Sequence, residues 1–597
     1  MVSFCFKGQK AYTPSLEVQG RKPMPPLSSI ALYFLLMKNI LLTIALLGNF
    51  APLYAQNRIL VNASATGANN GQTWVNAFDD LQIALQAAQA GDEVWVAQGT
   101  YYPTTTTDRA VSFEPKSGVM LYGGFAGNET TLDQRDWAVQ VTTLSGDIGI
   151  AGDSTDNSLN VVYLFQSDSS TVFDGFTVCF GVANDVAGAG SSLDRAICGG
   201  GLYIEAGNWD AFPNIQHCRF WRNAAHAFGG GVMVNGASDA GVAPNFVHCS
   251  FEENHSLSSG GGVARFGGSW TERGVDFQSC TFYKNRSVLG AGLYYGDTKG
   301  PNTVSIMGCR FDSNHADNKG GGAYFQTGKT GKSGLYIQNC AFEANKGLQG
   351  AAVEIFTNGN DFDGELLIDS CLFFRNISPP GGSAPAILYT DQFGTPSSLI
   401  KLSNSIVEEN WSASSNFSFS WVYAEMLIEN MFFVKNTCSA VIGQHDIYKS
   451  EIINTVFQEN VCGNIGFHFF YGDSTSLRLS NCLFKKNKTT SPVGLFRLSV
   501  QNFTVRNSAF LYEDHPKDFA RFIASLGSFF LYNTIITDSI TKWSFANGID
   551  SPVFLSHNSF GFIDCNDQYP KVNCGPGNIS GLDPMFRDTA NNDYSLL

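Results

Sequence analysis

Charged side chains are scarce in this chain of 597 residues, and basic ones are fewer than acidic ones. Only 15% of the residues are charged, and 52 Asp and Glu outnumber 37 Lys and Arg, which gives a formal net charge of −15. No stretch gathers the cations that would neutralise a phosphate backbone, so a nucleic-acid partner is excluded. The acidic balance leaves room for calcium without requiring it.

One apolar run stands out near the N-terminus, and it has the form of an export signal. A basic start at Met37 precedes an apolar core over 40–47 and a small-residue cleavage site that ends at Ala55. We therefore expect a signal peptide from Met37 to Ala55 and an exported mature chain without a membrane span. Residues 1–36 would then be an upstream extension from a misassigned start, and an uncleaved anchor over 30–50 is the alternative.

Glycine and phenylalanine are abundant, with 62 and 48 residues. A chain of this length exceeds what one compact core supports, so it must contain several domains or a repeat. The composition is too apolar for a disordered chain and too rich in glycine for a helical one. It favours a repeat.

A repeat does run through the middle of the chain. Six cysteines recur at intervals of 31, 31, 29, 31 and 31 residues, each followed two residues later by Phe and five residues later by Asn. The repeated positions are Cys218, Phe220, Asn223; Cys249, Phe251, Asn254; Cys280, Phe282, Asn285; Cys309, Phe311, Asn314; Cys340, Phe342, Asn345; and Cys371, Phe373, Asn376. A glycine-rich segment follows each Asn, and the period fits neither a leucine-rich repeat nor a propeller blade.

This period predicts one coil of a right-handed parallel β-helix, an all-β solenoid. Equivalent residues stack about 4.8 Å apart, so Phe and Cys would form interior columns and Asn would bond coil to coil at a corner. We expect a cap and first coils over 56–150, regular repeats over 151–400, and degenerate repeats with a truncated end over 401–597. Helical spacing over 78–88 predicts a short capping helix on the first coil.

Residues between the repeated positions would face outward. Tyr294 and Tyr324 lie at equivalent positions of adjacent coils and could form a platform on which sugars stack. Arg265 falls at an inward position, so we expect a shift or bulge in its coil. His217 and His248 precede ladder cysteines and should stack on the outer face as polar decoration rather than as a ligand set.

The 14 cysteines suggest disulfides at two places only, between Cys565 and Cys574 and, as the second choice, between Cys179 and Cys198. Stacked ladder cysteines lack the torsions that a disulfide needs, so we expect buried free thiols that act as apolar fillers. Cys565 and Cys574 are better candidates for a disulfide, because they flank a loop-like segment. Asp361, Asp363 and Glu365 surround a glycine turn and are the best candidates for a calcium site, although such runs are also ordinary turns.

The repeats and the segment before them resemble a known group of proteins. The Phe-x-x-Asn and Gly-Gly-x-apolar repeats are similar to those of the chlamydial polymorphic outer-membrane proteins and of β-helix proteins exported by Bacteroidetes. The segments 74–82, 91–101, 123–130 and 144–147 resemble the second group. The resemblance implies an exported β-helix, but no membrane barrel follows the repeats here, and the chain ends at Leu597 where relatives continue.

The expected function is therefore that of a monomeric exported or cell-surface protein with a structural, adhesive or glycan-binding role and no evident catalysis. Its partner would be a carbohydrate or another cell surface. The alternative is a lyase or glycoside hydrolase that acts on an acidic polysaccharide along the outer face. That chemistry needs a base and a positive charge or calcium on one face, and the fold alone does not supply them.

Overall fold

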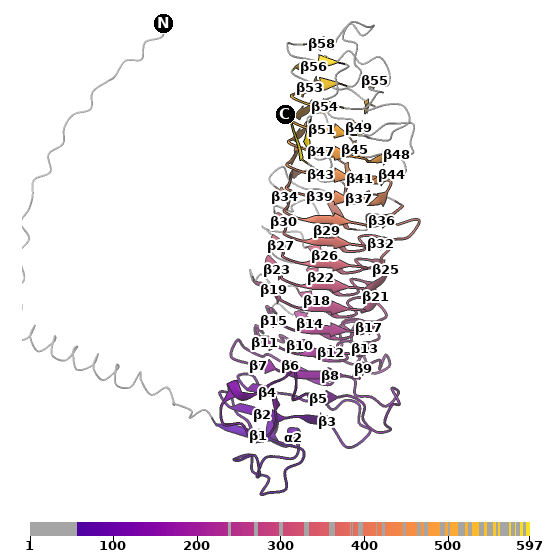
Figure 1. Ribbon diagram of the computed structural model, residues 1–597. Helices are drawn as coiled ribbons and strands as arrows, with labels where there is room; N and C mark the ends of the chain where they lie inside the picture. Colours follow the sequence, from indigo (N-terminus) through magenta and orange to yellow (C-terminus); the bar gives the residue numbers. More distant parts are fainter. Residues whose placement is uncertain are drawn as a thin grey trace, which may run out of the picture. The chain divides into compact units, whose positions relative to one another are not determined.

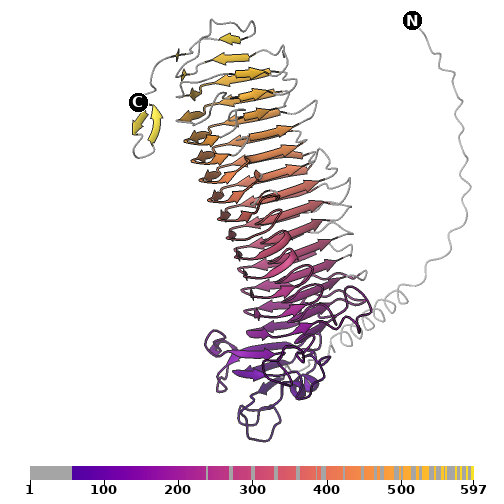
Figure 2. The same cartoon turned by 90° about the vertical axis from the view of Figure 1, so that its right-hand side faces the viewer.

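The chain forms a column of stacked coils (Figures 1 and 2). The computed structural model describes residues 57–236 without a break, most of 240–511, and beyond 511 chiefly the strands. Its strands run from β1 (Arg58–Val61) to β61 (Asp593–Leu596), with one α-helix, α2 (Leu81–Ala87). Nearly every strand pairs in parallel with its equivalent in the next coil, so the predicted right-handed parallel β-helix is confirmed.

Three long parallel sheets form the faces of the column. One regular coil contains four strands: β15 (Asn245–Val247), β16 (Ser250–Glu252), β17 (His255–Ser256) and β18 (Val263–Gly267). We call the sheets that contain β15, β16 and β18 sheets A, B and C. The next coil repeats the pattern in register, with β19 (Arg273–Gln278), β20 (Thr281–Tyr283), β21 (Arg286–Leu289) and β22 (Leu293–Asp297).

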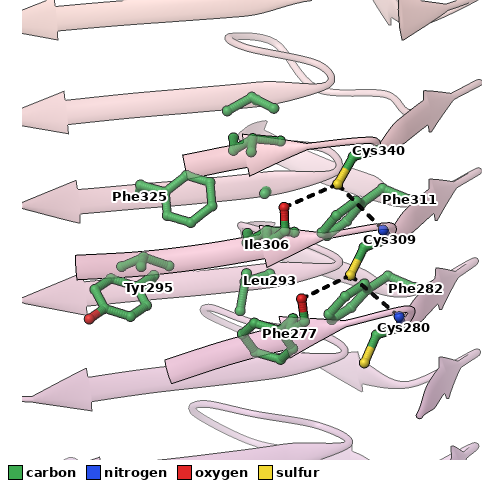
Figure 3. Packing of buried hydrophobic residues seen from close by; sticks show 14 of the residues in the cluster. Phe277, Cys280, Phe282, Leu293, Tyr295, Ile306, Cys309, Phe311, Phe325 and Cys340 are labelled. Atoms are coloured by element: carbon green, nitrogen blue, oxygen red, sulfur yellow. Dashed lines mark hydrogen bonds between the residues drawn. The ribbon is translucent and has the colours of Figure 1, made fainter. Parts of the chain in front are cut away.

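Columns of identical side chains fill the interior (Figure 3). Phe282 and Phe311 stack with their ring centroids 4.4 Å apart, and Phe311 and Phe342 with theirs 4.7 Å apart. All of these rings are buried, because residues two apart on a strand share a face and the repeat places Phe on the inner one. Burial of one Phe side chain in each coil contributes about 1.5–3 kcal/mol to stability, and this gain drives the stacking.

The repeated Asn residues form a buried hydrogen-bonded ladder at the corner after sheet B. Asn314 Nδ2 donates to Asn345 Oδ1 at 3.0 Å and to the Phe282 carbonyl at 2.9 Å. Its Oδ1 accepts from the backbone and side-chain nitrogens of Asn285. Each amide thus satisfies both its donors and its acceptor inside the protein, as the repeat predicts.

The ladder cysteines are free thiols, so this prediction is confirmed. Cys179 and Cys198 are also buried free thiols, so the disulfide suggested between them is wrong. The ladder cysteines are buried, and each sulfur lies against backbone groups rather than against another sulfur in a disulfide. Cys309 Sγ, for example, is 3.5 Å from the Phe277 carbonyl oxygen and accepts a hydrogen bond from the Cys280 N–H at 3.3 Å (Figure 3). Burial raises the pKa of the equivalent Cys482 thiol to about 11, which keeps it protonated and unreactive.

The glycine triplets form the turn that leads into sheet C. Gly260 has a φ of +67°, and a Cβ there would lie 2.7 Å from the Cα of Ala264. Only glycine accepts both the left-handed backbone and this close approach. The triplet is therefore a corner signature.

A cap covers the first coil, as the helical spacing predicts. Helix α2 begins after Asp80, whose carboxylate accepts a hydrogen bond from the Gln82 N–H. Leu81, Ala84 and Leu85 are buried in the same cluster as the strand residues of the first coils. The helix therefore covers what would otherwise be an open end of the solenoid. No helix in the described part of the chain is long and apolar enough to cross a membrane.

Arg265 does not disturb its coil, so the expected shift or bulge is wrong. Val234, Arg265 and Tyr295 are direct register partners on β14 (Val232–Gly236), β18 and β22. Arg265 is buried at an inward position, and its guanidinium carbon lies 4.5 Å from the centre of the Tyr295 ring. The arginine stays in register because an aromatic face in the next coil receives its planar cation.

Candidate aromatic and ionic site on the outer face

A cluster of aromatic and charged residues lies on the outside of the first coils, where sheet A turns into sheet B. Strands β4 (Met120–Phe125), β7 (Val172–Asp174), β11 (Asn214–Gln216) and β15 lie side by side in sheet A. Tyr122, Asp174 and Gln216 are register partners on the outer side of these strands. His217 and His248 follow β11 and β15 at the turn, with φ of 48° and 52°.

Asp174 holds the centre of the cluster. Arg135 NH2 donates to its Oδ2 at 2.5 Å, and His217 Nδ1 lies 2.9 Å from its Oδ1. The side chains of Arg135 and Asp174 are both buried, whereas that of His217 is partly exposed. An ionised carboxylate only accepts hydrogen bonds, so His217 carries its proton on Nδ1. In the neutral imidazole, Nε2 is then left as an acceptor.

Three rings lie in contact beside this ion pair. The Trp137 and His217 centroids are 4.0 Å apart with the rings tilted by 31°, and those of His217 and His248 are 5.4 Å apart with an interplanar angle of 10°. The predicted stacking of the two histidines is therefore confirmed. Trp137 is 40% exposed and His248 is also exposed. We call Trp137, His217 and His248 the ring row.

A pair of glycines brings Trp137 to the row. The segment after β4 turns back over Gly123 and Gly124, where the Asp136 N–H donates to the Gly124 carbonyl at 2.9 Å. Gly124 has a φ of +90°, and a Cβ there would lie 2.7 Å from the Cα of Trp137. Arg135 NH1 also donates to the Gly123 carbonyl at 3.1 Å. Any larger residue at Gly124 would push the indole away from His217.

The neighbouring strand of sheet B adds ion pairs and a second tryptophan. Arg219 donates to Glu252 from Nε at 2.9 Å and from NH2 at 2.6 Å, and Arg222 Nε donates to Glu253 at 2.8 Å. Both guanidinium groups lie over the ring of Trp221, at 4.8 and 4.6 Å from its centre. Opposite charges of adjacent coils therefore face each other at these positions of sheet B.

Tyr294 and Tyr324 stack but are not exposed, which corrects the expected platform. Their rings are 5.3 Å apart with an interplanar angle of 5°, and each residue is only 6% exposed. They point away from the main core, as expected, but join a second buried cluster that includes Met233 and Phe266. Burial raises the pKa of Tyr294 to about 12. The two ring faces lie against protein, so no open stacking surface is present at this position.

Glu354 continues the same outward column and is fully buried. Lys319 Nζ lies 3.3 Å from its Oε1, while its Oε2 has no hydrogen-bond partner among the described residues. Burial raises the pKa of Glu354 from its ordinary 4.5 to about 7, and the ammonium group of Lys319 opposes this only in part. The folded chain thus holds this proton at pH values where the unfolded chain has lost it.

Replacing Glu354 by Gln is therefore expected to flatten the pH dependence of stability. Because the folded pKa is the higher one, the free energy of unfolding should fall as pH rises from about 4.5 to about 7, by roughly 3 kcal/mol. Denaturant unfolding at several pH values would measure this, with Glu343→Gln as a control at an exposed ion pair. An unchanged pH slope in Glu354→Gln would contradict the assignment.

The remaining candidates from the sequence are only partly described. Asp361, Asp363 and the side chains of Cys565 and Cys574 lie outside the described residues, so the calcium site and the disulfide stay predictions. Glu365, the third calcium candidate, accepts a hydrogen bond from the Tyr336 hydroxyl at 3.1 Å. Among the described residues, no group of three or more His, Cys, Asp and Glu side chains is placed to hold a metal ion.

The sequence alone did not reveal the partners of His217. Asp174 precedes His217 by 43 residues, outside the regular period, because the first coils carry longer excursions. One signal was present: Gly175 occupies the turn position after β7 and its N–H donates to the Gln216 carbonyl. Aligning Gly175 with His217 would have placed Asp174 one coil below Gln216. Nothing in the sequence marks Arg135 and Trp137 as reaching the same place.

Comparison with known proteins gives only remote matches. No family model matches the chain, and no curated protein does. Among solved structures, the pectate lyase Pel9A is 12% identical, with 73% of this chain and 80% of that chain covered and a TM-score of 0.28. A mannuronic acid-specific family 6 polysaccharide lyase from human gut microbiota is 10% identical over 88% and 92%, at 0.30. A tailspike protein of an E. coli bacteriophage is 10% identical over 78% and 74%, at 0.20. The β-helix rests on the chain's own strand pairing.

Proposed function

We propose that this chain is an exported or cell-surface β-helix protein that binds glycans through the ring row. One observation carries the proposal: the rings of Trp137, His217 and His248 lie in a row on the outer face and are partly exposed, next to the buried ion pair of Arg135 and Asp174. Aromatic rings offer flat apolar surface to the C–H faces of sugars, and His217 Nε2 can accept from a hydroxyl. The ion pair fixes the row in advance, which lowers the entropic cost of binding.

The rigid column suits a structural or adhesive setting. The coils stack into a long column (Figure 1). The residues of the ring row follow β4, β11 and β15, which belong to the first coils. A ligand that binds there would leave the remaining coils free to act as a spacer. We therefore include display on a cell surface, as a monomer, in the proposal.

Binding to a printed array of glycans tests the proposed function. The double variant Trp137→Ala/His248→Ala is expected to lose at least about tenfold in affinity, because two stacking surfaces of about 1 kcal/mol each are removed. Trp411→Ala is the matched control, since Trp411 is 37% exposed on a distant strand, β36 (Trp411–Ser412). Equal binding by the wild type and the double variant would count against the ring row.

The hydrogen bond between Asp174 and His217 favours a second candidate function, cleavage of a polysaccharide. A carboxylate that orients a neutral imidazole is the arrangement of a general base, and Nε2 is the atom that would take the proton. The substrate would then be an acidic polysaccharide bound along the outer face. Release of new chain ends by the wild type and its loss in His217→Gln, with the fold intact, would establish this function. If no polysaccharide yields new chain ends, cleavage is ruled out and glycan binding remains as the proposed function.

A further inference from the structure

We propose that the glycan bound at the ring row is an uncharged one. The inference rests on the proposed function and narrows it to a substrate class. It follows from the state of the three arginines around the row, each of which is already paired with a carboxylate. It also follows from the two positions equivalent to His248 in the next two coils, where Ser279 and Gly308 have little or no side chain.

The cations around the row are neutralised within the protein. Arg135, Arg219 and Arg222 pair with Asp174, Glu252 and Glu253 at 2.5, 2.6 and 2.8 Å, so three positive charges meet three negative ones. An acidic polysaccharide would have to break these pairs or bind against a field without positive excess. Recognition of carboxylates or sulfates normally uses guanidinium groups whose positive charge is not balanced by the protein, and here a carboxylate balances each of the three.

The whole chain adds a further penalty for an acidic ligand. Its formal net charge is −15, and long-range electrostatics would slow the approach of a polyanion. An uncharged glycan meets no such barrier. It needs only ring surface and hydroxyl partners, both of which the row supplies.

The positions that follow His248 leave one face of its ring accessible. In the next two coils, the turn position occupied by His217 and His248 is taken by Ser279 and Gly308, which also have left-handed backbones with φ of 53° and 64°. Their side chains are too short to cover the imidazole in the way that His248 covers His217. A sugar ring placed on His248 would therefore lie above Ser279 and Gly308, with the Ser279 hydroxyl within its reach.

Salt dependence distinguishes this proposal from its opposite. Wild-type protein would be titrated with an uncharged oligosaccharide and with a uronate oligosaccharide of equal length at about 0.01 M and about 1 M salt, where the screening length falls from about 30 Å to about 3 Å. We expect binding of the uncharged ligand with less than about a twofold change across this range. Salt-sensitive binding of the uronate, with none of the uncharged ligand, would overturn the inference and leave the proposed function standing. Binding of neither would overturn both.

A gain-of-function variant provides a second test of this inference. Glu252→Gln/Glu253→Gln keeps side-chain volume but leaves Arg219 and Arg222 with unbalanced charge, so the variant should acquire salt-sensitive uronate binding, tighter than the wild type by about tenfold. Glu409→Gln is the matched control, because it unbalances Arg375 in a distant coil at the same distance of 2.8 Å. Equal uronate affinity in the wild type and the double variant would contradict the role assigned to the ion pairs.

Discussion

Replacing Asn314 by Ala is expected to destabilise the column by about 4 kcal/mol. The change removes the side chain that bonds to Phe282, Asn285 and Asn345. It leaves the backbone N–H of Asn285 and one of its two side-chain N–H donors buried without a partner, while Asn285 Nδ2 keeps its bond to the Phe251 carbonyl. An orphaned buried donor costs about 1–3 kcal/mol, so the two together outweigh any gain from the smaller side chain. Urea denaturation, with hydrogen exchange at the amides of Asn285 and Asn314, measures the loss and where it falls.

The chain contains its own control for this prediction. A second asparagine ladder runs along the exposed turn between sheets A and B, where Asn430 Nδ2 donates to Asn404 and accepts from Asn454 through its Oδ1. These groups can exchange their partners for water, and glycine accepts the left-handed φ of 55° at this position, so Asn430→Gly should cost less than about 1 kcal/mol. Equal costs for Asn314→Ala and Asn430→Gly would contradict the view that burial gives the inner ladder its weight.

Replacing Phe311 by Ala is expected to cost about 3–5 kcal/mol. The ring is fully buried and stacks on Phe282 and Phe342, so its removal leaves a cavity between two coils whose spacing is fixed by strand pairing. Because each coil contacts only its neighbours, hydrogen exchange should increase most in the adjoining coils and least at α2.

Phe432→Ala tests whether position or residue type decides the effect. Phe432 lies on the outer side of sheet B, in β39 (Phe432–Val434), and is 47% exposed. Its truncation should change stability by less than about 1 kcal/mol. A loss similar to that of Phe311→Ala would mean that the interior stack has no special role.

The interior of this protein could be predicted from its sequence because stacking repeats each physical constraint in every coil. A column position must suit the coil above and the coil below, so Phe282, Phe311 and Phe342 recur at nearly constant spacing. The capping helix was predictable for a related reason, since a solenoid needs its end covered. Fold and interior therefore followed from periodicity.

The outer face could not be predicted in the same way. Arg135 and Trp137 reach His217 from an excursion whose path depends on Gly123 and Gly124, and Asp174 lies outside the regular period. The burial of Tyr294 and Tyr324 could not be predicted, because residues from outside the repeated positions, such as Leu289, cover their column. The undisturbed register at Arg265 could not be predicted from the alternation within its own strand, because its aromatic partner, Tyr295, lies in the next coil.

The most direct test of the central claim is a crystal structure with the uncharged oligosaccharide that gives the strongest signal on the array. The account predicts one sugar ring against His248, above Ser279 and Gly308, and another sugar ring of the same chain against Trp137, with a hydroxyl donating to His217 Nε2. The ion pair between Arg135 and Asp174 should stay as it is in the free protein. Oligosaccharide bound on another face of the column, with the ring row left bare, would contradict the account.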